Sequence, residues 1–254
     1  MTDHKGAVLS YQLNKRTLGS FLMQCIYPHR CPVCDGVLFL SEKEWIHPEC
    51  RKKLSFAVEP RCFGCGKTLA DETAEYCPDC RRRRRSYVRN VAALHYNEAA
   101  RDSVVRFKYH GRQQYAVAYA GEIWRLRSEE ILSFKADALI PVPVHRARLL
   151  KRGYNQAELL AEELSKFSGI PLRRDVLFRP KKTAAQKALG PEARIRNLSG
   201  AFAVKSSVKG LNTVILVDDI FTTGSTMEAC TRVLKAAGIK TVYGVTLCVG
   251  MGEE

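Results

Sequence analysis

Two adjacent carboxylates followed by small hydroxyl residues form the stretch with the clearest chemical potential. Asp218 and Asp219 come directly after the apolar run 213–217. The next stretch, the hydroxyl loop, consists of Thr222, Thr223, Gly224, Ser225 and Thr226. Because a helical pattern follows, these hydroxyls and backbone amides lie at a helix N-terminus, which attracts anions. The pattern predicts a phosphate in the loop, with sugar hydroxyls or a Mg²⁺ ion at the carboxylates.

Cysteine pairs separated by two residues recur in the N-terminal part of the chain. The first set is Cys31, Cys34, His47 and Cys50, and the second set is Cys62, Cys65, Cys77 and Cys80. Two intervening residues let a tight turn aim both ligands at one ion, and the longer gap suits a short hairpin. We therefore expect structural Zn²⁺, one or two ions, rather than disulfides. His47 either completes the first set or is an ordinary surface histidine.

The remaining pattern predicts the elements that position these residues. Apolar stripes at helical spacing predict helices over 97–111, 115–132, 153–167 and 225–237. Short apolar runs predict strands over 138–144, 176–178, 201–204, 213–217 and 241–249. The alternation indicates an α/β fold with a parallel sheet flanked by helices, and ligands bind such sheets at the carboxyl ends of the strands. We expect an N-terminal arm or helix over 1–29, a zinc-binding module over 30–89 and the α/β domain over 90–254.

Basic residues dominate the charge of the chain. Its 41 Lys and Arg exceed its 26 Asp and Glu, for a net charge of +15. This balance favours phosphate-rich partners, either nucleic acid or phosphorylated metabolites, although solubility alone would also be served. A basic run follows the last cysteine of the second set: Arg81, Arg82, Arg83, Arg84 and Arg85. It predicts a grip on a nucleic-acid backbone or a solvated linker.

Two kinds of segment are not evident in the sequence. We find no apolar run of about 18 residues, so we expect no transmembrane helix. Residues 1–24 do not show the pattern of a secretory signal, and a cytoplasmic protein is expected. The aromatic residues of the zinc-binding module are scattered and could equally form its small core, so the sequence offers no evident stacking face for nucleotide bases.

The stretch ILVDDIFTTGST (215–226) resembles the phosphoribosyl-pyrophosphate signature of type I phosphoribosyltransferases. The resemblance implies that Asp218 and Asp219 contact the ribose hydroxyls, that the hydroxyl loop holds the 5-phosphate and that Mg²⁺ bridges the pyrophosphate. It also implies a pyrophosphate loop after an earlier strand, which here is Val144, His145 and Arg146. The base-binding hood varies in this fold, and the stretch around Tyr96, Phe107 and Lys108 is the candidate here.

Two further stretches extend the resemblance over most of the chain. PVPVHRARLLKRGYNQAELLA (141–161), RPKKTAAQKALGPEARIRNLSGAFAV (179–204) and the cysteine pairs together resemble the ComF competence-protein family. Its members join a zinc-ribbon-like module to a phosphoribosyltransferase-like domain, and His47 replaces the usual cysteine. The resemblance implies a flexible loop with Arg179, Gln186 and Arg194. It further implies a role in single-stranded DNA uptake with competence proteins as partners, in the cytoplasm or peripherally at the inner membrane.

Three functions remain open from the sequence. The favoured one is a protein that binds phosphoribosyl pyrophosphate and aids single-stranded DNA uptake in natural transformation. The second is an active phosphoribosyltransferase that acts on an unidentified base or other nucleophile without a DNA role. The third is a non-catalytic interaction protein at a membrane DNA channel. No residue pattern specifies an acceptor, so whether the protein is an enzyme stays open.

Overall fold

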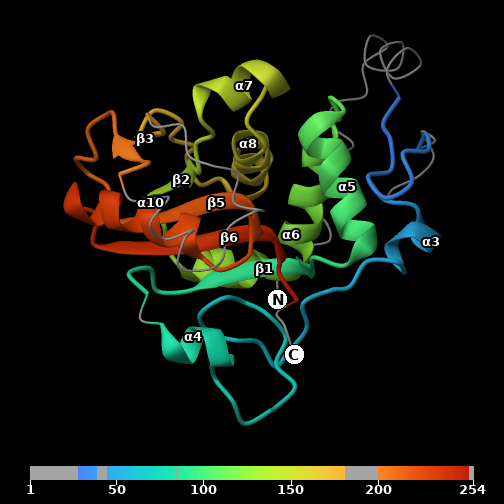
Figure 1. The fold of residues 1–254 in the computed structure, drawn as a ribbon, viewed down its shortest axis with the longest axis horizontal. Coiled ribbons are helices and arrows are strands. Elements are labelled where there is room, and N and C mark those ends of the chain that lie inside the picture. Colours follow the sequence, from blue (N-terminus) through green and yellow to red (C-terminus); the bar gives the residue numbers. More distant parts are fainter. Residues whose placement is uncertain (1–27, 39–44, 84, 181–199, 252–254) are drawn as a thin grey trace.

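A four-stranded parallel sheet forms the centre of the computed structural model, which describes residues 28–38, 45–83, 85–180 and 200–251 (Figure 1). The strand order is β1-β6-β5-β2, and every neighbouring pair is parallel. The strands are β1 (Asn90–His95), β2 (Ala138–Pro141), β5 (Thr213–Phe221) and β6 (Thr241–Val249). A separate antiparallel pair consists of β3 (Leu177–Phe178) and β4 (Ala203–Val204).

Helices pack on both sides of this sheet. The helices that the structure describes are α3 (Pro48–Arg51), α4 (Pro78–Arg82), α5 (Glu98–Tyr109), α6 (Tyr115–Ser133), α7 (Arg146–Arg152), α8 (Gln156–Ser168) and α10 (Ser225–Ala236). Of these, α4 and α7 have no buried residues and do not belong to the layers against the sheet. Alternate residues of a strand point to opposite faces. Ile215 and Val217 of β5 accordingly pack in one core cluster with α5, α6 and α8, whereas Val214 and Leu216 pack in another with α10. Burial on both faces explains why the strands are nearly continuous apolar runs.

The chain that leads from the first cysteine set into the second runs along the outer edge of β1. Its backbone is tied to β1 at both ends, because the His95 amide donates to the Ser55 carbonyl at 2.7 Å and the Asn90 amide donates to the Gly64 carbonyl at 3.0 Å. The first set lies on the α5 and α6 side, where its buried cysteines join the core cluster of those helices. The second set lies on the α10 side. The two sets are therefore separated by the sheet.

The predicted α/β fold is confirmed, and so are the helices at α5, α6 and α10 and the strand at β6. Strand β1 was not predicted, because its short apolar run reads equally as part of a loop. The predicted strand 138–144 ends early, at Pro141, and the predicted helix 153–167 is preceded by a separate helix, α7. Gly153 separates α7 from α8 through a left-handed conformation with φ of 81°.

The predicted end of the strand at Val217 is also wrong. Strand β5 continues to Phe221, because Asp218, Ile220 and Phe221 still pair with β6. The two carboxylates therefore lie inside the strand. Among the described residues, no helix combines the length and the apolar character that a membrane crossing requires. The predicted arm over 1–29 lies almost wholly outside the described residues, and the predicted division at residue 90 stays a prediction.

Candidate zinc centres and anion-binding site

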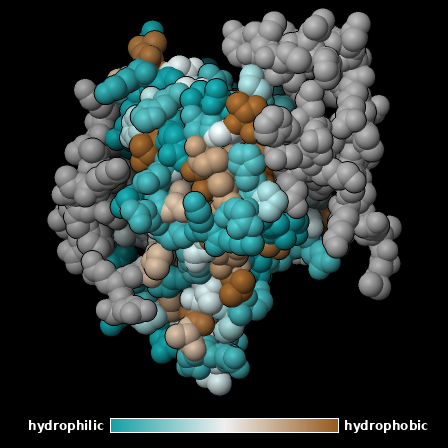
Figure 2. All heavy atoms as spheres, turned by 90° about the vertical axis from the view of Figure 1, so that its right-hand side faces the viewer, coloured by the Kyte–Doolittle hydropathy of each residue, from teal (hydrophilic) through white to brown (hydrophobic). Residues whose placement is uncertain are grey.

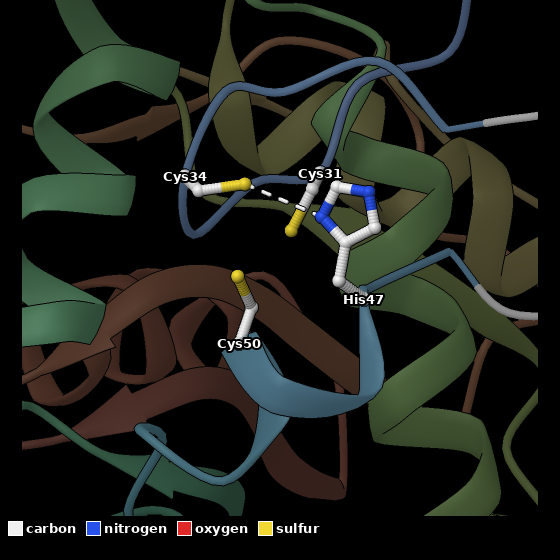
Figure 3. Close-up of side chains that lie close together, drawn as sticks. All are labelled: Cys31, Cys34, His47 and Cys50. Atoms are coloured by element: carbon white, nitrogen blue, oxygen red, sulfur yellow. Dashed lines mark hydrogen bonds between the residues drawn. The ribbon is translucent and has the colours of Figure 1, made fainter.

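The first cysteine set converges in space although its residues come from two separate segments (Figure 3). Cys31 and Cys34 flank a tight turn, whereas His47 and Cys50 lie at the start of α3 and within it. One ligand atom of each residue lies within 4.8 Å of the others. The Sγ of Cys34 is 3.3 Å from the Nδ1 of His47. Three thiols and one imidazole arranged in this way suit a tetrahedral Zn²⁺ ion.

The ring of His47 is oriented as a metal ligand would be. Its Nε2 lies 3.2 Å from the carbonyl oxygen of Val37, and only an N–H can donate to a carbonyl. The proton therefore belongs on Nε2, which leaves the lone pair of Nδ1 directed at the thiols. Burial raises the pKa of Cys34, but hydrogen bonds from the Gly36 amide, Cys50 and Cys31 oppose this effect, and the pKa is lowered to about 7. The structure thus supports His47 as a ligand rather than as a surface histidine.

The second set forms a more buried cluster of four thiols. The sulfur atoms of Cys62, Cys65, Cys77 and Cys80 all lie within 4.8 Å of one another. The Cys77 amide donates to the Cys62 sulfur at 3.2 Å, a contact that stabilises a thiolate. A side chain at Gly64 would place its Cβ only 3.0 Å from the Cys80 sulfur, so a larger residue in the turn between the first two cysteines would crowd the cluster. Four convergent thiols fit a structural Zn²⁺ ion.

The hydroxyl loop connects β5 to the N-terminus of α10. Gly224 is the residue before the helix and has a left-handed φ of 73°. A Cβ on Gly224 would lie 2.5 Å from the Cζ atom of Phe221, so only glycine fits. The hydroxyls of Thr223 and Ser225 lie 2.7 Å apart. The loop lines a small pocket together with the Asp218 side chain. Anions are stabilised at such a position, where helix amides lack intrahelical partners.

The carboxylates of Asp218 and Asp219 have different neighbours, as expected for successive residues of a strand. Asp218 lines the pocket of the hydroxyl loop. Asp219 forms an ion pair with Lys108 of α5, in which Nζ and Oδ2 are 2.9 Å apart. Burial lowers the pKa of Lys108, but the negative charge of Asp219 outweighs this effect and raises it. The sequence marked Lys108 only as a hood residue; its pairing with Asp219 follows from the packing of α5 beside β5.

The pKa of the Asp218 carboxyl group is well above that of an ordinary aspartate. Burial and the adjacent charge of Asp219 raise its pKa from 3.8 to about 7. The charges of Lys108 and Arg179 and a 2.8 Å hydrogen bond from the Asp219 amide act in the opposite direction. The pair therefore carries less negative charge near neutral pH than its sequence implies, which makes the pocket more favourable to an anion.

The structure describes some of the remaining predicted site residues and not others. His145 is the N-cap of α7, and its Nδ1 accepts a hydrogen bond from the Ala147 amide at 3.1 Å, so the protonated nitrogen of the neutral ring is Nε2. Val144 precedes this cap, and Arg146 is exposed on the first turn of α7. The guanidinium of Arg179 lies 5.0 Å from the centre of the Phe202 ring. Gln186 and Arg194 lie outside the described residues, so the predicted flexible loop stays a prediction.

The arginine run is divided by the structure. Arg81 and Arg82 are exposed at the end of α4, and Arg83 follows the helix. Arg85 is half-buried, and its Nη2 donates to the Thr223 carbonyl at 2.8 Å. Arg84 lies outside the described residues. The run therefore includes two exposed cations and one that contacts the hydroxyl loop, and the predicted DNA contact stays a prediction.

Comparison with known proteins defines the class of the chain. Residues 22–81 match the family model of a double zinc ribbon domain, and residues 149–254 match that of a phosphoribosyl transferase domain. The first match contains both cysteine sets, and the second contains the hydroxyl loop and both carboxylates. The sequence and the sheet topology agree with these matches. The chain is thus a double zinc ribbon followed by a phosphoribosyltransferase-like α/β domain.

Relatives over almost the whole chain identify the family. Competence protein F of Haemophilus influenzae is 32% identical over 87% of this chain and 96% of that protein. The DNA utilization protein YhgH of Salmonella typhimurium is 31% identical over 87% of this chain and 97% of that protein. Competence protein ComFC of Bacillus subtilis is 29% identical over 82% and 89%. The chain belongs to the competence protein F (ComF) family.

We expect two Zn²⁺ ions per chain, measured by elemental analysis of the purified protein. His47→Ala should retain about one ion, because the first set then offers only three ligands, whereas His47→Cys should retain two. His110→Ala, which removes an exposed histidine, is the matched control and should not change the zinc content. Protein without zinc and with these cysteines paired as disulfides would contradict both centres. Full zinc content in His47→Ala would exclude the histidine as a ligand.

Asp218→Asn should raise the melting temperature of the ligand-free protein, because it removes a carboxylate whose ionisation penalises the folded state. The folded-state pKa of about 7 lies above the ordinary value of 3.8. The wild type therefore loses stability as the pH rises from about 4 to about 7, by roughly 1.4 kcal/mol per pH unit at most. The gain in the variant should be larger near pH 8 than near pH 5 in thermal denaturation. An equal gain at both values would show that Asp218 titrates normally.

Proposed function

We propose that the protein binds phosphoribosyl pyrophosphate together with Mg²⁺ and acts in the handling of single-stranded DNA. The observation that carries the first part is the pocket in which Asp218 faces the hydroxyl loop at the N-terminus of α10. The loop offers amides and hydroxyls to the 5-phosphate, and the carboxylate offers an acceptor to a ribose hydroxyl. This combination fits a phosphorylated sugar better than either a free phosphate or a bare cation.

The same residues suit the chemistry of phosphoribosyl transfer. As the bond between ribose C1 and the pyrophosphate oxygen breaks, positive charge develops on the sugar ring, and a nearby carboxylate stabilises that charge. Mg²⁺ would enter with the pyrophosphate and neutralise the leaving group. Lys108 and Arg179, whose positive charges lower the pKa of Asp218, contribute positive charge beside it. An acceptor nucleophile would form the new bond to C1, and no nucleophilic side chain is needed.

The variant Asp218→Asn, Asp219→Asn should lose binding of phosphoribosyl pyrophosphate, because a neutral amide has one acceptor oxygen and accepts from a ribose hydroxyl more weakly than a charged carboxylate. Isothermal titration calorimetry in the presence of Mg²⁺ measures the affinity, and thermal denaturation measures the ligand-dependent stabilisation. Asp102→Asn removes an exposed carboxylate of α5 and should bind like the wild type. A wild-type protein without any ligand-dependent shift at saturating phosphoribosyl pyrophosphate would refute the proposed ligand.

The second ribbon, which is the part of the double zinc ribbon that contains Cys62, Cys65, Cys77 and Cys80, supports the DNA part of the proposal. Phe63 and Tyr76 are 40% and 37% exposed, and their rings form an edge-to-face pair with centroids 5.9 Å apart. The Arg89 guanidinium lies 4.8 Å from the centre of the Phe63 ring. Figure 2 shows hydrophobic residues at the surface of the lower part of the molecule, where Figure 1 places the second ribbon. Scattered in the sequence, these two aromatic residues thus form a small exposed pair.

An exposed aromatic pair beside cations is a surface on which unpaired bases stack while phosphates contact arginines. Arg81 and Arg82 on α4 lie on the same ribbon and are exposed. The names of the relatives refer to competence and DNA utilization, which agrees with this chemistry. We therefore propose that single-stranded DNA binds to the second ribbon without sequence preference.

Arg81→Ser with Arg82→Ser should weaken binding of a short single-stranded oligonucleotide and flatten its salt dependence. Each lost phosphate contact lowers the slope of log affinity against log salt by about 0.7, so the double variant should lose about 1.4. Fluorescence anisotropy at several salt concentrations measures the slope. Arg173→Ser with Arg174→Ser removes the same charge elsewhere and should leave it unchanged. Equal slopes for wild type and the Arg81/Arg82 variant would refute DNA contact by these arginines.

A further inference from the structure

The segment that follows the second ribbon is bonded directly to the hydroxyl loop and to α10. Arg85 Nη2 donates to the Thr223 carbonyl at 2.8 Å. The Ser86 amide and hydroxyl donate to the two carboxylate oxygens of Glu228 at 2.8 and 2.7 Å. Burial raises the pKa of Glu228, but the hydrogen bonds from Ser86 and the charge of Arg232 outweigh it and keep the pKa below its usual value. Glu228 is therefore an ionised acceptor, which strengthens both bonds.

Tyr87, the next residue along the chain, packs against the hydroxyl loop. Tyr87 is only 3% exposed, and its ring packs edge-to-face against Phe221, with centroids 6.2 Å apart. The Tyr87 hydroxyl lies 3.0 Å from the position that a Cβ would occupy on Gly224. Phe221 directly precedes the hydroxyl loop, and Gly224 is the middle residue of the loop. The loop is therefore packed against Tyr87 with no room for a larger residue at its tightest point.

The hydrogen bond from Arg85 to the Thr223 carbonyl also fixes the direction of the Gly224 N–H. In a planar trans peptide the carbonyl and the next N–H point in opposite directions. Fixing the Thr223 carbonyl toward Arg85 therefore directs the Gly224 N–H away from Arg85. Because Gly224 can adopt many backbone conformations, this peptide has little stiffness of its own. The hydrogen bond from Arg85 therefore restrains a peptide that the loop residues by themselves leave flexible.

The position of Arg85 depends in turn on the second cysteine set. Helix α4 has five residues, begins after Cys77 and contains Cys80. A helix of this length is not stable by itself in water, so its placement depends on the ligand cluster. The second set and Tyr87 also share one core cluster with Phe221 of the sheet. A continuous packed path therefore joins the metal ligands to the hydroxyl loop.

We infer that Arg85, Ser86 and Tyr87 are positioning residues through which the second ribbon holds the hydroxyl loop in its anion-binding conformation. The inference rests on the proposed sugar-phosphate site and adds a role for the ribbon that is separate from DNA contact. The arginine run then has two roles, because Arg85 holds the hydroxyl loop whereas Arg81 and Arg82 face outward, where DNA can reach them. Loss of metal from the second set then loosens the loop, and loss from the first set, across the sheet, does not.

The decisive experiment compares Arg85→Ser with Arg82→Ser, which removes the same side chain from the same run without touching the loop. We expect Arg85→Ser to weaken binding of phosphoribosyl pyrophosphate with Mg²⁺ by about tenfold, the change that corresponds to one charge-assisted hydrogen bond. Arg82→Ser should keep the wild-type affinity, and Arg85→Lys should recover part of the loss. Hydrogen exchange of the amides at 222–226 should accelerate in ligand-free Arg85→Ser only.

A second comparison tests the dependence on metal. Cys80→Ser should accelerate exchange at 222–226 and weaken ligand binding, whereas Cys34→Ser should change neither, with zinc content and circular dichroism as controls of folding. If Cys80→Ser does not fold, the Arg85 series decides alone. Wild-type exchange rates and affinity in Arg85→Ser would overturn the inference and leave the proposed ligand intact. If the wild type does not bind phosphoribosyl pyrophosphate, the proposed function falls, and the exchange rates still decide whether Arg85 holds the loop.

Discussion

Backbone pairing along the outer edge of β1 is the constraint on which the arrangement of this protein depends. The chain that leads from the first cysteine set into the second is hydrogen-bonded to β1 at Ser55 and Gly64. An unpaired sheet edge exposes a row of amides and carbonyls, and this segment satisfies them. The chain crosses the edge as it pairs, so the two metal-binding sets are buried against opposite sides of one sheet. The ribbons are thereby built into the core rather than attached to it by a linker.

This placement gives the two ribbons unequal relations to the pocket of the hydroxyl loop. The second ribbon shares a core cluster with α10 and Phe221, and the segment after it reaches the hydroxyl loop. The first ribbon packs with α5 and α6 on the other side. Yet α5 also contributes Lys108, whose ion pair with Asp219 lies on that side. Lys108 on one face of the sheet and Arg85 on the other thus place positive charge near the end of β5. Both charges reduce the free-energy cost of placing a polyanion beside Asp218 and Asp219.

The run of arginines illustrates how one basic segment serves more than one contact. Charge alone does not separate its members, because all of them would attract phosphate. Their separation comes from the end of α4, after which the chain turns inward to β1. Arg81 and Arg82 stay on the exposed helix, and Arg85 is drawn against the Thr223 carbonyl. The second ribbon thus carries exposed cations on one side and contacts the hydroxyl loop on the other.

The sequence by itself determined the cysteine sets, the hydroxyl loop and most helices, because these features are local. Ligand spacing, a glycine with positive φ and an apolar helical stripe each act over a few residues. Only the tertiary structure decided that β5 continues through Asp218 and Asp219, since the added pairing is with β6. It also decided the partners of His47, Lys108 and Arg85. Those contacts join residues that are distant in the chain, and their geometry is set by packing across the sheet, which no local pattern encodes.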